Sequence, residues 1–296
     1  MNRSTLFVAG ACALAFATAA HATGFGPSAP RRCGAPAAFP SARAFSGLRA
    51  VGLTADQRLI CFDEDVPALA TAIGAISGLD GDTRLVGIDV RPATGALWGL
   101  GDGGGLYEIS LDDATATRRA QLSVALDGAA FDVDFNPTVD RLRVISDAGQ
   151  NLRVNVDTGA ATEDSDLNYP PPANVNPATG VTGAAYTNND GHAETATTLY
   201  DLDTALDQIV VQSPPNAGPL AATGKLVLDA TADAGFDIYT VVRGGRATDN
   251  RALAVLTVGG RPRLYQINLL TGRASLRGTF GARHPVVDLA IPLNQF

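Results

Sequence analysis

The chain repeats itself, and an internal repeat constrains a fold more than any other feature of a sequence. Three segments share one order of apolar runs and turns, and they begin LVGIDV at residue 85, FDVDFN at residue 131 and GFDIYT at residue 235. An aspartate lies in the first apolar run of each, with another in the last such run of the chain: Asp89, Asp134, Asp237 and Asp288. Ala185 stands at the equivalent place in GAAYTN, so the marker recurs every 45 to 52 residues.

That interval is the span of one four-stranded propeller blade and not of a helical pair. The first unit, from residue 48, begins at its second strand, and the lone run VVDLAIP at residues 286–292 matches its missing first strand. We therefore predict an all-β, five-bladed β-propeller of four-stranded antiparallel blades, closed by the C-terminal strand. The predicted blades are residues 48–79 with 285–292, 84–123, 129–167, 181–228 and 234–281.

The first 22 residues have the pattern of a signal peptide. Arg3 precedes an apolar stretch from Leu6 to Ala20, and Ala20-His21-Ala22 fits a small-x-small cleavage site. Residues 23–47 are rich in proline, alanine and arginine and are expected to form an extended lead segment before a single propeller at residues 48–296. No later segment has the roughly 18 apolar residues of a membrane helix, so we expect an exported protein, periplasmic or extracellular.

Two cysteines remain after the signal, Cys33 and Cys61. In an oxidising compartment such a pair is most simply a disulfide, and two buried free thiols are the alternative. A C-x-x-C redox spacing is absent, so a bridge here would be structural.

The net charge of the chain limits the kinds of molecule that it can bind. The formal net charge is −8, and Lys225 is the only lysine, so an acidic surface would repel phosphate backbones and anionic membranes. We expect a monomer that binds neither nucleic acid nor membrane, with an unidentified protein or glycan as its partner.

Three segments exceed the length of a hairpin turn and are expected to be loops that could carry a binding surface: residues 168–179, 187–197 and 243–250. Residues 66–73 align with a fourth strand, although a helix is the alternative there.

The aspartates are the one chemical pattern that the repeat generates. First strands of propeller blades surround the central channel, so the four could form a ring that attracts Ca²⁺. Asp132, Asp134 and Asn136 also share one strand face and are a weak Ca²⁺ candidate. The alternative, which we favour, is that these carboxylates accept hydrogen bonds that hold blade against blade. No cofactor is expected, and no metal beyond this Ca²⁺ candidate.

Other motifs indicate no chemistry. Gly99, Gly101 and Gly104 spell G-x-G-x-x-G, but a strand follows where a dinucleotide site needs a helix. His192 and His284 lie in different blades, which disfavours a zinc site. Trp98, the only tryptophan, is expected to pack in the core, with a sugar-stacking role as the alternative.

Long strings of the chain resemble a bacterial family known as domain of unknown function 4394. They include LVGIDVRPATGALWGL, FDVDFNPTVDRLRV and VTGAAYTNN, and the resemblance runs from about residue 79 to residue 290. It implies an exported, propeller-like protein, and it brings no activity, cofactor or catalytic residue with it.

Two functions compete at this point. The first is a non-enzymatic binding or scaffold module for a protein or glycan, because strands are well specified while no nucleophile or cofactor loop occurs. The second is a carbohydrate- or lactone-directed hydrolase or lyase acting in the central channel through aspartates. An open channel with separated carboxylates would favour the enzyme, and a channel closed by hydrogen bonds would favour the binding module.

Overall fold

The computed structural model describes residues 1, 33, 47–189, 195–244 and 246–295. The chain divides into two units, residues 1–31 and 32–296, and all described secondary structure lies in the second. The expected signal peptide and lead segment, and His192 in the second expected loop, fall almost wholly outside the described residues. Among the described residues no helix is long and apolar enough to cross a membrane.

The propeller has five four-stranded antiparallel sheets, and in each the strands follow one another from the inner to the outer edge. Blade 1 consists of β20 (Val286–Ala290), β1 (Arg49–Thr54), β2 (Arg58–Asp63) and β3 (Thr71–Ala75). Blade 2 consists of β4 (Leu85–Val90), β5 (Leu97–Gly101), β6 (Gly105–Ile109) and β7 (Ala116–Gln121). Blade 3 consists of β8 (Phe131–Asn136), β9 (Arg141–Ser146), β10 (Asn151–Val154) and β11 (Ala161–Glu163). Blade 4 consists of β12 (Val181–Tyr186), β13 (Leu199–Asp203), β14 (Gln208–Gln212) and β15 (Leu220–Lys225). Blade 5 consists of β16 (Ala234–Arg243), β17 (Arg246–Val258), β18 (Arg261–Ile267) and β19 (Ala274–Thr279).

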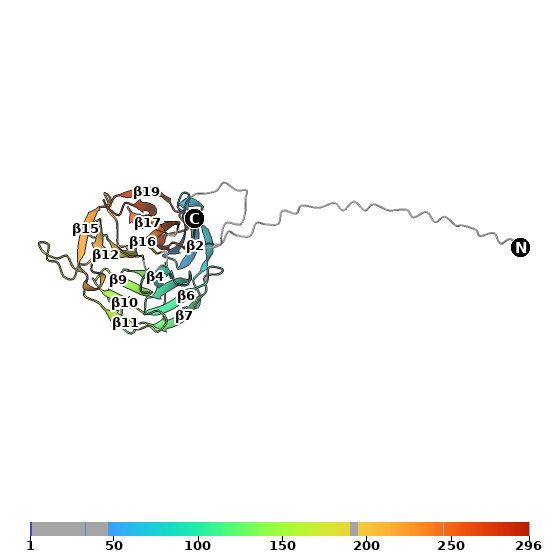
Figure 1. Cartoon of the computed structure of the whole chain (residues 1–296), viewed down its shortest axis with the longest axis horizontal. Coiled ribbons are helices and arrows are strands. Elements are labelled where there is room, and N and C mark those ends of the chain that lie inside the picture. Colours follow the sequence, from blue (N-terminus) through green and yellow to red (C-terminus); the bar gives the residue numbers. More distant parts are fainter. Residues whose placement is uncertain (2–32, 34–46, 190–194, 245, 296) are drawn as a thin grey trace. The chain divides into compact units, whose positions relative to one another are not determined.

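The C-terminal strand closes the ring, as predicted. β20 pairs antiparallel with β1, with Val51 opposite Ala290 and Leu53 opposite Asp288. In Figure 1 the red C-terminal end of the chain meets the blue strands of blade 1, and the five blades follow one another around a common centre. The inner strand of blade 1 therefore comes from the opposite end of the chain to its other three strands.

The core lies between the blades. Five hydrophobic clusters each draw buried side chains from two neighbouring blades, for example Leu59 with Leu97 and Leu100 with Val144. Inner strands approach closely where one carries a glycine: a Cβ on Gly235 would lie 2.4 Å from Oδ1 of Asp288. This position tolerates no side chain, because the blades are already in contact.

Cys33 and Cys61 form the predicted disulfide, with Cα atoms 5.7 Å apart. Cys33 is buried among side chains of blades 1 and 2, and Cys61 lies in β2. On a chain-entropy estimate a bridge of this span stabilises the fold by about 3–4 kcal/mol. It fixes part of the lead segment to the first blade.

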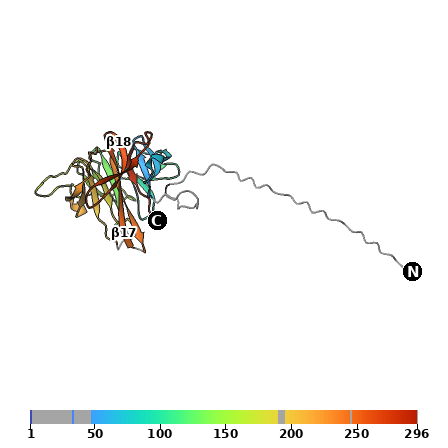
Figure 2. The same ribbon diagram turned by 90° about the horizontal axis from the view of Figure 1, so that it is seen from above.

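Two local expectations change. Residues 243–250 are not a loop, because β16 pairs with β17 as far as Arg243 opposite Arg246. Gly244 indicated a turn, but the β-branched residues before it extend the strand and so lengthen the hairpin. The hairpin projects from the body of the propeller in Figure 2. Residues 66–73 form neither a full helix nor a full strand: a 3₁₀ turn, η1 (Pro67–Leu69), precedes β3.

Candidate functional site

Five aspartates from the inner strands are gathered at the centre of the ring. Their exposed fractions are 6% or less: Asp89, Asp132, Asp134, Asp237 and Asp288. They come from β4, β8, β16 and β20. Strand β8 supplies both Asp132 and Asp134, because a strand presents every second side chain to the same side.

The carboxylates form two layers and not one ring. Asp89 accepts the N–H of Phe135, one residue after Asp134, and Asp134 accepts that of Tyr186, one residue after Ala185. By the same relation Asp237 accepts the N–H of Ile291, one residue after Ala290. Ala290 therefore holds the position in β20 that the repeat appeared to give to Asp288.

Asp288 and Asp132 form the second layer. Asp288 accepts the N–H of Ile88, and Asp132 accepts that of Ala184. These two donors stand one residue before Asp89 and Ala185, whereas the donors of the first layer stand one residue after the equivalent positions. The expected equivalence of Asp288 with Asp89 is thus wrong by two residues. A shift of two keeps a side chain on the same face of a strand, so the aspartate still points to the channel.

Each carboxylate acts as a clamp to the next blade around the ring. The bridging bonds measure 2.7 Å for Asp288, 2.7 Å for Asp89, 2.9 Å for Asp132, 3.1 Å for Asp134 and 2.6 Å for Asp237. All except Asp134 also accept the N–H of the following residue in their own strand. Backbone donors at the centre are paired in this way, which buried N–H groups require.

Blade 4 has Gly183 and Ala185 at the two clamp positions, and neither residue has a polar side chain. Asn189 makes the side-chain bonds to blade 5 in their place. Thr240 of β16 donates its N–H to Asn189 Oδ1 at 3.0 Å, and Asn189 Nδ2 donates to the carbonyl of Ile238 at 2.8 Å. Every one of the five blade interfaces therefore carries a side-chain clamp. The repeat revealed the gap at Ala185, but Asn189 lies beyond the strand, where the repeat has no position to compare.

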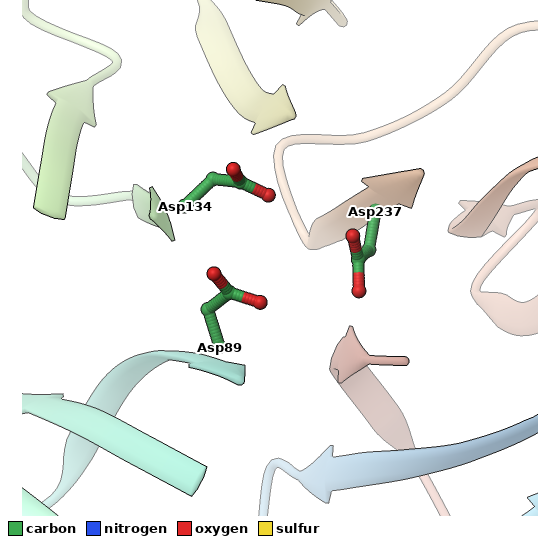
Figure 3. Close-up of side chains that lie close together, drawn as sticks. All are labelled: Asp89, Asp134 and Asp237. Carbon is green, nitrogen blue, oxygen red and sulfur yellow. The ribbon is translucent and has the colours of Figure 1, made fainter. Parts of the chain in front are cut away.

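Burial makes this centre electrostatically unusual. Carboxylate oxygens of Asp89, Asp134 and Asp237 lie within 4.8 Å of one another, and Figure 3 shows the three groups pointing towards a common point. Burial raises the pKa of Asp237 and of Asp288 to about 7. Burial, and then the charge of neighbouring aspartates, raises the pKa of Asp89 and of Asp134 well above the ordinary range.

These three carboxylates could hold a hard cation, but the arrangement is not the one expected from the sequence. Asn136 Oδ1 is already used as an acceptor, because it accepts the N–H groups of Thr138 and Val139 in the following turn. A Ca²⁺ ion takes six to eight oxygens. The oxygens at the centre already face backbone donors, so the geometry is that of a clamp.

A pocket lies away from the channel, where blade 2 meets blade 3. It encloses about 380 Å³ and is lined by Arg91, Thr94, Ala96, Trp98, Glu108, Arg119 and Asp157. Asp89, Trp98 and Glu108 lie directly opposite one another on β4, β5 and β6, so one row of side chains runs from the channel into the pocket. Strand β7, which carries Arg119, the turn after β4 and the turn after β10 supply the remaining sides.

Charged groups in this pocket are held in pairs. Arg91 donates to Asp140 and to Asp157 through two hydrogen bonds each, and these ion pairs raise its pKa. Arg119 donates twice to Oε2 of Glu108, at 3.0 and 2.6 Å. The guanidinium groups are therefore oriented by their partners.

Trp98 packs against the core as expected, and it also forms one wall of the pocket. Its ring meets Phe135 edge-on at 6.3 Å between centroids, and the guanidinium of Arg91 lies 5.7 Å from the ring centroid. Its indole N–H is buried and has no acceptor among the described residues. Sequence reasoning did not find this pocket, since its residues come from two blades and share no motif; the cross-strand row through Trp98 was the one available signal.

Comparison with known proteins finds a family that matches most of the chain. The model of a family described as a domain of unknown function (DUF4394) matches residues 58–290. No curated protein matches the chain.

Solved structures show only distant likeness. A protein of unknown function from Bacteroides thetaiotaomicron is 14% identical, with a TM-score of 0.47, over 84% of this chain and 68% of that one. An auxiliary nutrient binding protein from the same species is 11% identical, with a TM-score of 0.43, over 79% and 59%. One from Bacteroides ovatus is 12% identical, with a TM-score of 0.38, over 70% and 56%. The chain spans less than two thirds of the two nutrient binding proteins, and at TM-scores below 0.5 these likenesses carry no conclusion about function.

Proposed function

The chain belongs to the DUF4394 family, and from that premise we propose that it is an exported, non-enzymatic binding module whose ligand site is the pocket beside Trp98. The observation that carries the proposal is the contrast between two groups of polar side chains, the aspartates of the channel and the residues that line the pocket. Carboxylates of the channel are buried and bonded to backbone, whereas the pocket offers oriented polar groups in a volume that suits small ligands.

The channel gives little support to the alternative of a hydrolase or lyase. A pair of catalytic carboxylates must reach the substrate, and glycosidases space them about 5–10 Å apart across an open site. Here Asp89, Asp134 and Asp237 are each at least nine-tenths buried, and each accepts the N–H of a residue in the next blade. Such groups serve the ring and do not face a substrate.

Ligand binding can be tested at the pocket itself, because Trp98 is the only tryptophan of the chain. All tryptophan emission of the chain therefore comes from one wall of this pocket. We expect a ligand screen to find compounds that change Trp98 emission saturably and that lose this effect in Arg119→Ala.

Arg58→Ala is the matched control, because Arg58 forms a comparable exposed pair with Asp56 outside the pocket. Compounds that bind the protein equally well in both variants would argue against the pocket.

Export and a monomeric state belong to the same proposal. The Cys33–Cys61 bridge supports export, since disulfides persist in oxidising compartments. N-terminal sequencing of the periplasmic or secreted protein should begin at Thr23, and light scattering should give the mass of one chain. An intact Met1 in the mature protein would contradict removal of the signal peptide, and the mass of a dimer would contradict the monomeric state.

A further inference from the structure

We infer that the pocket beside Trp98 binds a neutral, polyhydroxylated ligand, namely a sugar residue of a glycan. This inference rests on the proposed function, because it names the ligand of the same pocket. Three properties of the pocket lead to it: its charge balance, its remaining hydrogen-bonding groups and its size.

Charge balance excludes an anion as the natural ligand. Arg91 is neutralised by Asp140 and Asp157, and its side chain is only 10% exposed. Arg119 is neutralised by Glu108. A phosphate, sulfate or uronate would have to compete with carboxylates already in place, in a protein whose net charge is −8.

Remaining hydrogen-bonding groups alternate between donors and acceptors. Both bonds from Arg119 reach Oε2 of Glu108, so Oε1 stays available as an acceptor among the described residues. Arg119 keeps donors beyond the two it uses, since a guanidinium has five N–H groups. Vicinal hydroxyls both donate and accept, so they match an arginine and a carboxylate held side by side.

Trp98 contributes an apolar wall and no accessible donor, because its indole N–H is buried. Trp98 and Ala96 also give the pocket an apolar portion, which suits the C–H faces of a sugar ring.

Size favours a short piece of glycan over a protein surface. About 380 Å³ lies at the lower end of the volumes of small-molecule sites, roughly 300–1,000 Å³. A protein partner would instead need a contact face of about 800 Å². The pocket therefore fits one end or one unit of an oligosaccharide.

The test is a fluorescence titration of Trp98 with three panels of probes. The first holds neutral gluco-, manno-, galacto- and xylo-oligosaccharides, the second oligogalacturonate and sulfated dextran, and the third short peptides. We expect a neutral oligosaccharide to change Trp98 emission saturably, and Glu108→Ala and Arg119→Ala each to weaken binding about ten- to a hundredfold. Arg58→Ala should leave the affinity within twofold.

The outcomes separate the inference from the proposed function. Saturable binding of only an anionic probe or a peptide, lost in Arg119→Ala, would overturn the neutral sugar and keep the pocket as a binding site. Sugar binding measured by calorimetry that survives both pocket variants would place the sugar elsewhere and overturn the inference. No response to any panel, by fluorescence or calorimetry, would overturn both.

Discussion

Asp288 and Ile88 are 200 residues apart in the chain, yet the N–H of Ile88 donates to Oδ2 of Asp288 at 2.7 Å. This bond joins β20 of blade 1 to β4 of blade 2. It belongs to a series in which at least one side chain at each blade interface bonds the backbone at the inner strand of the next blade. The ring is thus held at its centre by hydrogen bonds as well as between its blades by apolar packing.

Removing a clamp should destabilise the ring. Asp89→Ala leaves the N–H groups of Phe135 and Val90 without their acceptor, so we expect the free energy of unfolding to fall by about 1–3 kcal/mol. Urea denaturation measures the change. Asp56→Ala, at an exposed position, serves as the control and should stay within about 0.5 kcal/mol of the parent protein. A variant Asp89→Ala as stable as that control would show that the clamp is dispensable.

Asn189 should behave as the clamp of blade 4. Asn189→Ala removes the acceptor of the Thr240 N–H and the donor to Ile238, so a loss of about 1–3 kcal/mol is expected here too. Asn189→Asp keeps the acceptor and should recover part of the loss. Equal stabilities of the parent and Asn189→Ala in urea would remove Asn189 from the series.

Stability should depend on pH in a direction opposite to that of most proteins. Burial raises the pKa of Asp237 and Asp288 from 3.8 to about 7, so the folded chain holds more protons than the unfolded chain between these values. The free energy of unfolding therefore falls as pH rises from about 4 to about 7. Each unit by which a pKa is raised corresponds to about 1.4 kcal/mol.

Thermal melts between pH 4 and pH 8 test this dependence, and Asp288→Asn should flatten the curve because it removes one titrating group. Carboxyls with lowered pKa, such as Asp102, titrate below this window. A melting temperature that rises steadily from pH 4 to pH 7 would refute the role assigned to the channel aspartates.

Calcium should have no effect on stability if the carboxylates are clamps. We expect the melting temperature to be the same in millimolar CaCl₂ and in EDTA, because the oxygens of Asp89 and Asp237 already accept backbone N–H groups. A cation that bound the folded chain alone would raise the melting temperature with its concentration. A Ca²⁺-dependent rise that disappears in Asp134→Ala would establish a metal site instead.

Deleting residues 286–296 should abolish the closed ring. The deletion removes β20 and Asp288, which exposes the edge of β1 and breaks the bond to Ile88. Exposed strand edges promote pairing between molecules. We expect aggregation or a broad, non-cooperative melt in calorimetry, and an unchanged sharp transition would contradict the closure.

Most of the architecture could be predicted because the repeat is a property of local strand patterns. The number of blades and the separate final strand follow from the spacing of apolar runs. The register of the strands does not follow to better than two residues, because moving Asp288 by two residues preserves the alternation of side chains on which the alignment depends. The position of Ala290 became clear only from which backbone N–H each carboxylate accepts.

The pocket could not be predicted for a different reason. Arg91, Glu108, Arg119 and Asp157 are ordinary surface residue types, and only the contact between two blades brings them together. Asn189 poses the same difficulty, because its role depends on Thr240, some fifty residues later and in the neighbouring blade.

The late position of β20 also has a consequence for how the protein is made. While the chain emerges from a ribosome or a translocation pore, blade 1 has three strands and no inner one until residues 286–290 arrive. Neighbouring domains usually fold as soon as they are synthesised, but this ring can close only after β20 has emerged. All the strands of blades 2 to 5 are thus made before the inner strand of blade 1, so the last step of assembly joins two segments that are synthesised at very different times.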